Sequence, residues 1–174
     1  MIILLLEILG TIAFAVVGAS IALERHLDVF GVLIDSVVSA TGGGILRDIK
    51  LGNVPPVTFR NPTNIIAALL GCLVIIIAFK RNRALSTSEA IRKTVDVFDT
   101  IGLSVFTING IDTALAFNPE HRAFLLSFVG VITAVGGGVI RDVLVGRIPF
   151  VLKRDIYATA SIIGSVAYIA ACIM

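Results

Sequence analysis

Two stretches of the sequence combine three consecutive glycines with an Arg-Asp pair, residue types that can bind an anion, shape a turn or interrupt a helix. The first reads GGGILRDIKLGNVP from Gly42 to Pro55, and the second reads GGGVIRDVLVGRIP from Gly136 to Pro149. A nucleotide-binding loop of the P-loop type needs a Gly-Lys-Ser/Thr ending and a preceding strand. Neither stretch has that ending and no strand is expected before it, so a nucleotide site is excluded.

The two stretches are copies of one another, separated by a constant offset of 94 residues. The segments before them match more weakly at an offset of 92: LGTIAFAVVGASIAL begins at Leu9, and IGLSVFTINGIDTAL begins at Ile101. The difference of two residues falls in the connecting loop, where insertions are tolerated. The positions shared by both copies pair Gly42, Gly43, Gly44, Arg47 and Asp48 with Gly136, Gly137, Gly138, Arg141 and Asp142.

Polar residues inside apolar segments are further candidates for a site. Asp35 lies in the middle of one such segment, with Ser39 four positions later on the same helix face. An ionisable residue there is costly and is by default a functional candidate; the alternative for Asp35 is a partner arginine in the other repeat. Glu7 and Asp99, related by the repeat, are expected near opposite faces of the membrane. The residues expected to line a pathway are Asp35, Ser39, Thr41, Asn109, Asp112 and Thr133.

No combination of residues supports catalysis. His26 and His121 fall in short loops without a serine or cysteine at a useful spacing, and Cys72 and Cys172 lie in apolar segments as expected structural thiols. The net charge of +2, without a basic patch interleaved with aromatics, argues against a nucleic-acid partner. We therefore expect no enzymatic activity, no cofactor and no resident metal ion.

The composition indicates which elements must position these residues. Of the 174 residues, 57% are hydrophobic and only 15% are charged, and the mean hydropathy is +1.02. A membrane-spanning helix needs roughly 20 consecutive apolar residues. The sequence therefore predicts an all-α integral membrane protein, its first segment a retained helix rather than a signal peptide. The six expected spans cover residues 2–23, 29–46, 62–79, 95–117, 122–140 and 155–174.

The repeat divides the chain into two three-helix units, residues 1–79 and 95–174, joined by a polar linker at residues 80–94. Three is an odd number of spans, so the second unit is expected to be inverted in the membrane relative to the first. Ten of the fourteen basic residues fall in the first, third and fifth loops. Basic loops favour the cytoplasm, which predicts an N-terminus outside the cell.

The triple glycines then face opposite sides of the membrane, and two interpretations of them remain open. Three consecutive glycines cost a helix about 1 kcal/mol each relative to alanine. In one interpretation they permit tight packing before a helix stop, and the Arg-Asp pairs are interfacial anchors. In the other they are helix breaks that act as hinges of a gated pathway, which Arg47, Asp48, Arg141 and Asp142 control by ion pairing.

Duplicated GGG-x-x-RD-x-x-x-G-x-x-P motifs within inverted three-helix repeats resemble the prokaryotic TRIC proteins, the trimeric intracellular cation channels. Sequences of this family often carry a "glycine transporter" domain label. The resemblance covers nearly the whole chain and implies a homotrimer with one pore per subunit, between the second and fifth helices. It implies that these helices are kinked at Gly42–Gly44 and Gly136–Gly138, and that K⁺, and to a lesser degree Na⁺, passes in transit. The family's seventh helix would follow the sixth, beyond Met174.

The sequence and the resemblance together predict a K⁺-permeable channel for monovalent cations in the prokaryotic plasma membrane, surrounded by membrane lipids. The main alternative is a secondary transporter of a small zwitterion such as glycine, in which the same repeats rock between two states. A structural or assembly protein would need neither Asp35 nor the polar fourth helix.

Overall fold

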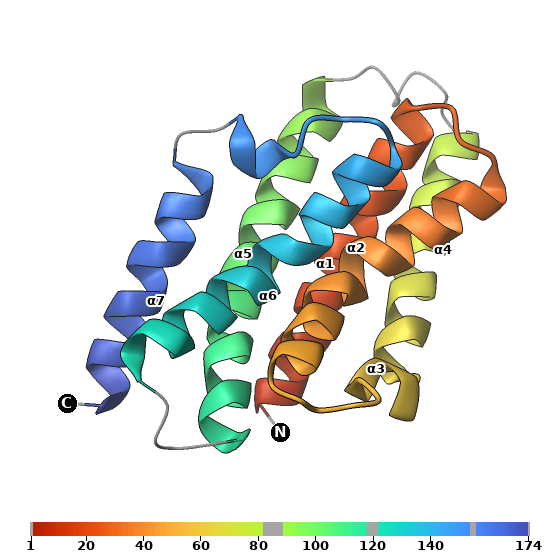
Figure 1. The fold of residues 1–174 in the computed structure, drawn as a ribbon. Coiled ribbons are helices and arrows are strands. Elements are labelled where there is room, and N and C mark those ends of the chain that lie inside the picture. The colour runs from red at the N-terminus through yellow and green to blue at the C-terminus, as the bar shows by residue number, and fades with distance from the viewer. Residues whose placement is uncertain (1, 82–88, 118–121, 154–155, 174) are drawn as a thin grey trace.

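The computed structural model describes residues 2–81, 89–117, 122–153 and 156–173, and over these ranges the chain is helical with short connections and no strand (Figure 1). The predicted all-α class is confirmed. Within the described ranges there are six long helices, one short helix and one 3₁₀ turn. They are α1 (Ile2–Glu24), α2 (Val29–Lys50), α3 (Val57–Arg60), α4 (Thr63–Arg81), α5 (Glu89–Phe117), α6 (Ala123–Leu144), the turn η2 (Phe150–Leu152) and α7 (Tyr157–Ile173).

The outward surfaces of the long helices are apolar. Phe124 is 84% exposed, and Leu70 and Val166 are exposed in the middle of their helices. Five helices (α1, α2, α4, α5 and α6) are long and apolar enough to cross a membrane, and α7 is a shorter apolar helix. With 17 residues, α7 extends about 25 Å and reaches the lower limit for a span. The chain is an integral membrane protein.

The two ends of the chain lie on the same side of the bundle (Figure 1). We call this side the terminal face, and the opposite side, where α4 ends and α5 begins, the linker face. The short helix α3 follows α2 on the terminal face, whereas η2 follows α6 on the linker face. Equivalent segments of the two repeats thus lie on opposite faces, as expected for inverted copies.

An aromatic pair holds α1 against α5. The rings of Phe14 and Phe106 stack with centroids 5.2 Å apart and an interplanar angle of 16°. Each ring fills the space left by a glycine of the other helix: a Cβ on Gly10 would lie 3.2 Å from Phe106, and one on Gly102 would clash with Phe14. Phe14 and Phe106 are 92 positions apart, so the pair lies where the two repeats meet.

A pair of glycines holds α2 against α6. A Cβ on Gly43 would collide with the backbone oxygen of Thr133, and a Cβ on Gly137 would collide with the backbone oxygen of Ser39. The offset of 94 converts one contact into the other, because Gly43 corresponds to Gly137 and Ser39 corresponds to Thr133, so the crossing has the symmetry of the repeat. Small residues at a crossing let membrane helices approach to backbone contact, the first of the two uses expected for these glycines.

The expected interruption of the helices at the triple glycines is not what the structure shows. α2 continues without a break through Gly42–Gly44 to Lys50, and α6 continues through Gly136–Gly138 to Leu144. Both helices therefore end four residues later than predicted, and the Arg-Asp pairs lie inside their last two turns. The close contacts at the crossing offset the low helix propensity of glycine. A hinge at these positions remains a prediction.

The later glycine of each motif ends the helix. Gly52 has φ +74° and Gly146 has φ +67°, the left-handed conformation that favours glycine. After α2 the Asn53 N–H donates to the carbonyl of Asp48, a bond typical of a Schellman ending, and Arg147 makes the equivalent bond after α6. Each helix thus ends in a short turn that the last glycine of its motif makes possible.

The linker expected at residues 80–94 is shorter in the structure. α4 extends to Arg81, and α5 begins at Glu89, six residues before the expected start of the fourth span. Residues 82–88 of the expected linker lie outside the described ranges. The first turn of α5 carries an exposed ion pair of Glu89 with Lys93, 3.0 Å apart, which suits a helix that projects beyond the apolar layer.

Candidate functional site

The end of α2 carries a group of four residues, here called the terminal cluster: the buried Arg47, Asp48 and Asn109, and the backbone of Val57. Arg47 donates from Nε and Nη2 to Oδ1 of Asp48, at 2.9 Å each, and from Nη1 to the side-chain oxygen of Asn109 on α5. The other oxygen of Asp48 accepts the backbone N–H of Val57 at 2.8 Å. Asp48 thereby joins the guanidinium to the first turn of α3.

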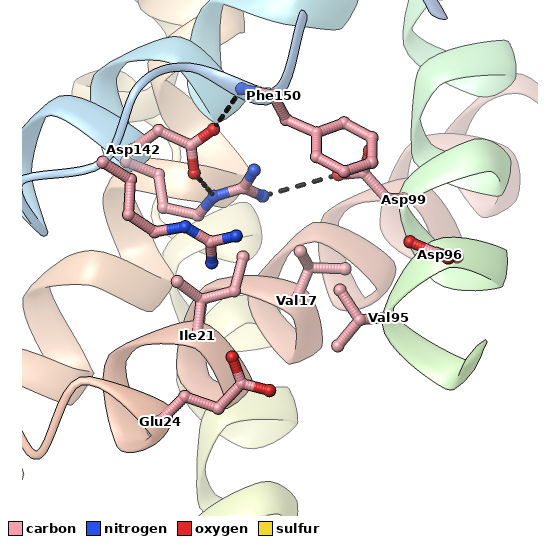
Figure 2. A pocket seen from close by; sticks show the side chains of 10 residues that line it. Val17, Ile21, Glu24, Val95, Asp96, Asp99, Asp142 and Phe150 are labelled. Atoms are coloured by element: carbon pink, nitrogen blue, oxygen red, sulfur yellow. Dashed lines mark hydrogen bonds and ion pairs between the residues drawn. The ribbon is translucent and has the colours of Figure 1, made fainter. Parts of the chain in front are cut away.

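The end of α6 carries the equivalent group, here called the linker cluster: Asp99, Arg141, Asp142 and Phe150. Arg141 Nε donates to Oδ1 of Asp142 at 3.0 Å, and its Nη1 lies 3.4 Å from Oδ1 of Asp99. Oδ2 of Asp142 accepts the backbone N–H of Phe150 at 2.7 Å. Figure 2 shows these contacts at the side of a cavity.

The two clusters share the Arg-Asp pair and the bond to the following loop, but differ in the third partner. That partner is the neutral Asn109 in the terminal cluster and the carboxylate of Asp99 in the linker cluster. Both partners lie on α5, ten positions apart, which is about 15 Å along the helix. The terminal cluster thus has balanced charges, whereas the linker cluster has one excess negative charge.

Burial excludes the interpretation of these pairs as interfacial anchors. Arg47 is 6% exposed and Arg141 is 2% exposed, and Asp48 and Asp142 are equally enclosed. A snorkelling side chain would instead keep its charged end in water. A buried ion pair is costly to desolvate unless further hydrogen bonds satisfy it, and both clusters supply those bonds.

Asp35 and Ser39, on one face of α2, form a polar site without partners. They are 3% and 1% exposed, and no described residue makes a hydrogen bond to either carboxyl oxygen of Asp35 or to Ser39 Oγ. Arg141 and Asp142 are the charged groups that act electrostatically on Asp35, although neither bonds to it. The alternative of a direct ion pair for Asp35 is therefore not observed. A buried polar group left without a bond lowers stability, so folding does not account for this residue.

The threonines expected in the pathway bond to their own helices. Thr41 donates to the carbonyl of Val37 at 2.8 Å, and Thr133 donates to that of Val129 at 2.6 Å. Each oxygen keeps acceptor capacity. Thr133 packs against Gly110 of α5 as its repeat counterpart, Ser39, packs against Gly18 of α1.

Asn109 and Asp112, expected on one face of the fourth span, point to different neighbours. Asn109 bonds to Arg47, whereas Asp112 accepts a hydrogen bond of 2.8 Å from the hydroxyl of Tyr168 on α7. Positions three apart differ by about 60° around a helix, enough to reach two different elements. The structure therefore does not bring Asp112 to the terminal cluster.

A cavity of about 120 Å³ lies beside the linker cluster (Figure 2). Its charged groups are Glu24 of α1, Asp96 and Asp99 of α5, Arg141 and Asp142 of α6, and Arg147. Its apolar lining comes from Val17, Ile21, Val95 and Phe150. Sequence reasoning named Asp99 only through its repeat counterpart and missed Glu24 and Arg147, because only the folded chain brings them together.

Glu7, the repeat counterpart of Asp99, lies on α1 towards the terminal face and accepts a hydrogen bond of 2.8 Å from Asn64 of α4. Glu7 and Asp99 are thus near opposite faces, as predicted. Within the described ranges no three potential metal ligands converge, and the buried Cys72 thiol donates to the carbonyl of Val32 at 3.8 Å. His121 and the side chain of Cys172 lie outside the description.

Comparison with known proteins places these features in a family. A family model described as "Glycine transporter" matches the chain twice, over residues 4–80 and 96–172. The UPF0126 inner membrane protein YadS of Escherichia coli K12 is 40% identical over 163 residues, which cover 94% of this chain and 75% of YadS. The UPF0126 membrane protein YvgT of Bacillus subtilis is 35% identical over 160 residues, which cover 92% of this chain and 76% of YvgT.

Solved structures agree with this assignment. A TRIC trimeric intracellular cation channel orthologue from Rhodobacter sphaeroides is 30% identical with a TM-score of 0.84, and the match covers 97% of this chain and 83% of that one. A prokaryotic TRIC channel crystallised in 0.5 M KCl is 33% identical with a TM-score of 0.87, over 97% and 82%. The chain, which the "Glycine transporter" model matches in both halves, belongs to the prokaryotic TRIC channel family.

Proposed function

We propose that the chain forms a channel for monovalent cations, permeable to K⁺, with one pathway in each subunit between α2 and α6. The observation that carries the proposal is the buried, unpartnered carboxyl of Asp35 with the hydroxyl of Ser39 one turn deeper on the same helix. A cation that leaves water needs oxygen ligands to replace its hydration shell. Carboxyl and hydroxyl oxygens without other bonds supply such ligands.

The pathway runs from the cavity at the linker cluster past Asp35, Ser39 and Thr133 to the terminal cluster. An arginine lies at each end, bonded to groups on α5. A guanidinium in the pathway opposes the entry of a cation, so each Arg-Asp pair acts as a closed gate. The gate opens when the partner on α5 releases the arginine. The backbone contact of Gly43 with α6 closes the direct route between α2 and α6, and opening requires the helices to move there.

The relatives support the type of activity. The similar solved structures are described as TRIC cation channels, one of them as trimeric. We infer a homotrimer of this chain on that ground, with lipids around its apolar surface. We infer the bacterial plasma membrane as its location, because the relative from Escherichia coli is an inner membrane protein.

The N-terminus is inferred to lie outside the cell, so that the linker face is cytoplasmic. Most basic loop residues belong to the linker face. Arg47 and Arg141 were counted as loop residues, but both are buried within helices. Leaving both arginines out of the count takes one basic residue from each face, so the linker face keeps its excess of basic loop residues.

Transport of a small zwitterion such as glycine is the second candidate, favoured by the description of the family model. In that case Asp35 would receive the ammonium group and an arginine the carboxylate. We expect no enzymatic activity in either case.

Recordings from purified protein in planar lipid bilayers under a KCl gradient test the channel. Unitary currents that reverse near the K⁺ equilibrium potential are expected. Silent bilayers, together with saturable glycine uptake into proteoliposomes of the same preparation, would replace the channel by the transporter. Sidedness is tested separately, by labelling a single cysteine introduced at Arg25 in intact cells, where an impermeant reagent is expected not to react.

A further inference from the structure

The cavity at the linker face has an excess of negative charge. Among its described lining residues, Glu24 and Asp99 bring two carboxylates and Arg147 brings one cation, while Asp96 takes part in a further interaction of its own. The remaining charged pair, Arg141 with Asp142, is internally balanced, and both oxygens of Asp142 are already bonded. The cavity volume of about 120 Å³ is that of a few water molecules at roughly 30 Å³ each, enough for a partly hydrated ion.

Asp99 presents an unused oxygen to this cavity. The residue is 4% exposed and lines the cavity, and no described side chain makes a hydrogen bond of good geometry to its Oδ2, although the hydroxyl of Tyr157 on α7 acts on the same carboxylate. Its Oδ1 lies 3.4 Å from Arg141 Nη1, longer than the 2.7–2.9 Å of a strong charge-assisted bond. Figure 2 shows this long contact crossing the space beside Phe150. Asp99 is thus only loosely held by the guanidinium.

We propose that this cavity is a binding site for a monovalent cation on Asp99, and that occupancy releases Arg141 from α5. The cation binds Oδ2 of Asp99 and reduces the attraction of that carboxylate for Arg141, which then stays bonded to Asp142 alone. This inference rests on the proposed function, since the released arginine is one of its two gates.

The site makes the two ends of the pathway unequal. Asn109 takes the place of Asp99 in the terminal cluster and has no charge for a cation to neutralise. K⁺ at the linker face is therefore expected to shorten the closed periods of the channel, whereas K⁺ at the terminal face is not. The permeating ion would thus regulate its own passage from one side.

The first test does not depend on conduction. Thermal unfolding of the purified protein is compared in KCl and in N-methyl-D-glucamine chloride at equal ionic strength. A site filled only in the folded state raises the melting temperature, here by about 2–4 °C for a ligand contribution of about 1 kcal/mol. Asp99→Asn keeps an acceptor for Arg141, as Asn109 provides for Arg47, and is expected to lose the K⁺-specific rise.

The matched control is Glu89→Gln, the same change of charge on an exposed carboxylate of the same helix. It is expected to keep the K⁺-specific rise. A rise that persists in Asp99→Asn, or that is absent from the wild-type protein, overturns the site. If the wild-type protein shows the rise but no unitary currents, the site stands and the channel proposal fails.

The second test uses bilayers with the protein in one known orientation. Raising KCl on the linker side is expected to shorten the mean closed time of the wild-type channel several-fold, and to leave that of Asp99→Asn unchanged. Equal responses to K⁺ on both sides, or an unchanged response in the variant, would show that Asp99 does not couple the ion to Arg141.

Discussion

Gly43 and Gly137 face each other where α2 crosses α6, and the position of each missing side chain is occupied by a backbone oxygen of the other helix. The two contacts are related by the repeat, because Gly43 meets Thr133 and Gly137 meets Ser39. The local symmetry axis therefore passes through this crossing. Any movement that opens a pathway between the two helices must separate these contacts.

Gly43→Ala and Gly137→Ala are each expected to destabilise the protein. The added methyl group meets a backbone oxygen, which cannot move aside as a side chain could by changing its rotamer. Overpacking of this kind costs about 1–3 kcal/mol. Thermal unfolding in detergent measures the effect. Gly44→Ala is the matched control, since its Cβ would find only the Arg47 guanidinium, 3.8 Å away. It is expected to be neutral or stabilising, and an equal loss in all three variants would mean that helix flexibility, not space, is decisive.

Asp48→Asn and Asp142→Asn are expected to lower stability strongly. Each carboxylate bonds an arginine with one oxygen and the following loop with the other, and an amide cannot accept at both positions. Loss of one partner from a buried ion pair costs about 3–5 kcal/mol. Chemical or thermal unfolding provides the measurement.

The control for this pair is Asp28→Asn at the start of α2. Asp28 is exposed and accepts the N–H of Gly31 as an N-cap, a role that asparagine performs equally well. Its unfolding midpoint is expected to match that of the wild type. Were Asp48→Asn as stable as Asp28→Asn, the Arg-Asp pair would not be the element that fixes the end of α2.

Asn109→Asp is expected to hold the gate at the terminal face more tightly. The substitution gives Arg47 a charged third partner like the one that Arg141 has in Asp99. A hydrogen bond to a charged group is about twice as strong as a neutral one. Longer closed periods are expected in bilayer recordings, with unchanged unitary conductance. Shorter closed periods, or a changed conductance with normal gating, would contradict the gating role.

The sequence predicted the helices and the repeat well, because both depend on local composition and on internal comparison. It failed at Gly42–Gly44, where low helix propensity suggested a break. Contacts with Thr133 and Ser39 decide that point, and they come from the other repeat. The actual helix ends lie just before Gly52 and Gly146. Each of these is the last glycine of its motif and was visible in the sequence.

The candidate site was predicted in part. The Arg-Asp pairs and Asp35 were named from the sequence, since charged residues in apolar segments stand out. Asn109 and Asp99 were also named, but not as partners of the arginines, because Asn109 is 62 positions from Arg47 and Asp99 is 42 positions from Arg141. Asp112 was grouped with Asn109 by spacing alone, and the rotation of α5 sends it to Tyr168 instead.

Substitution of Asp35 can distinguish a functional role from a structural one, because its buried carboxyl makes no hydrogen bond that the substitution would remove. Asp35→Ala is expected to leave stability unchanged or higher, because an unsatisfied polar group is removed. The same substitution is expected to reduce K⁺ conductance several-fold, since the pathway loses a carboxyl ligand. Unfolding curves and unitary currents of one preparation measure both effects.

Ser36→Ala, at the next position of α2, is the control in which stability rather than conductance is expected to change. Ser36 is fully buried and donates to the carbonyl of Ala15 at 2.9 Å, so its loss should cost about 1 kcal/mol of stability. Its unitary conductance is expected to stay at the wild-type value. If Asp35→Ala conducts like the wild type, the carboxyl is not in the ion pathway. If it unfolds like Ser36→Ala, the carboxyl supports the fold instead.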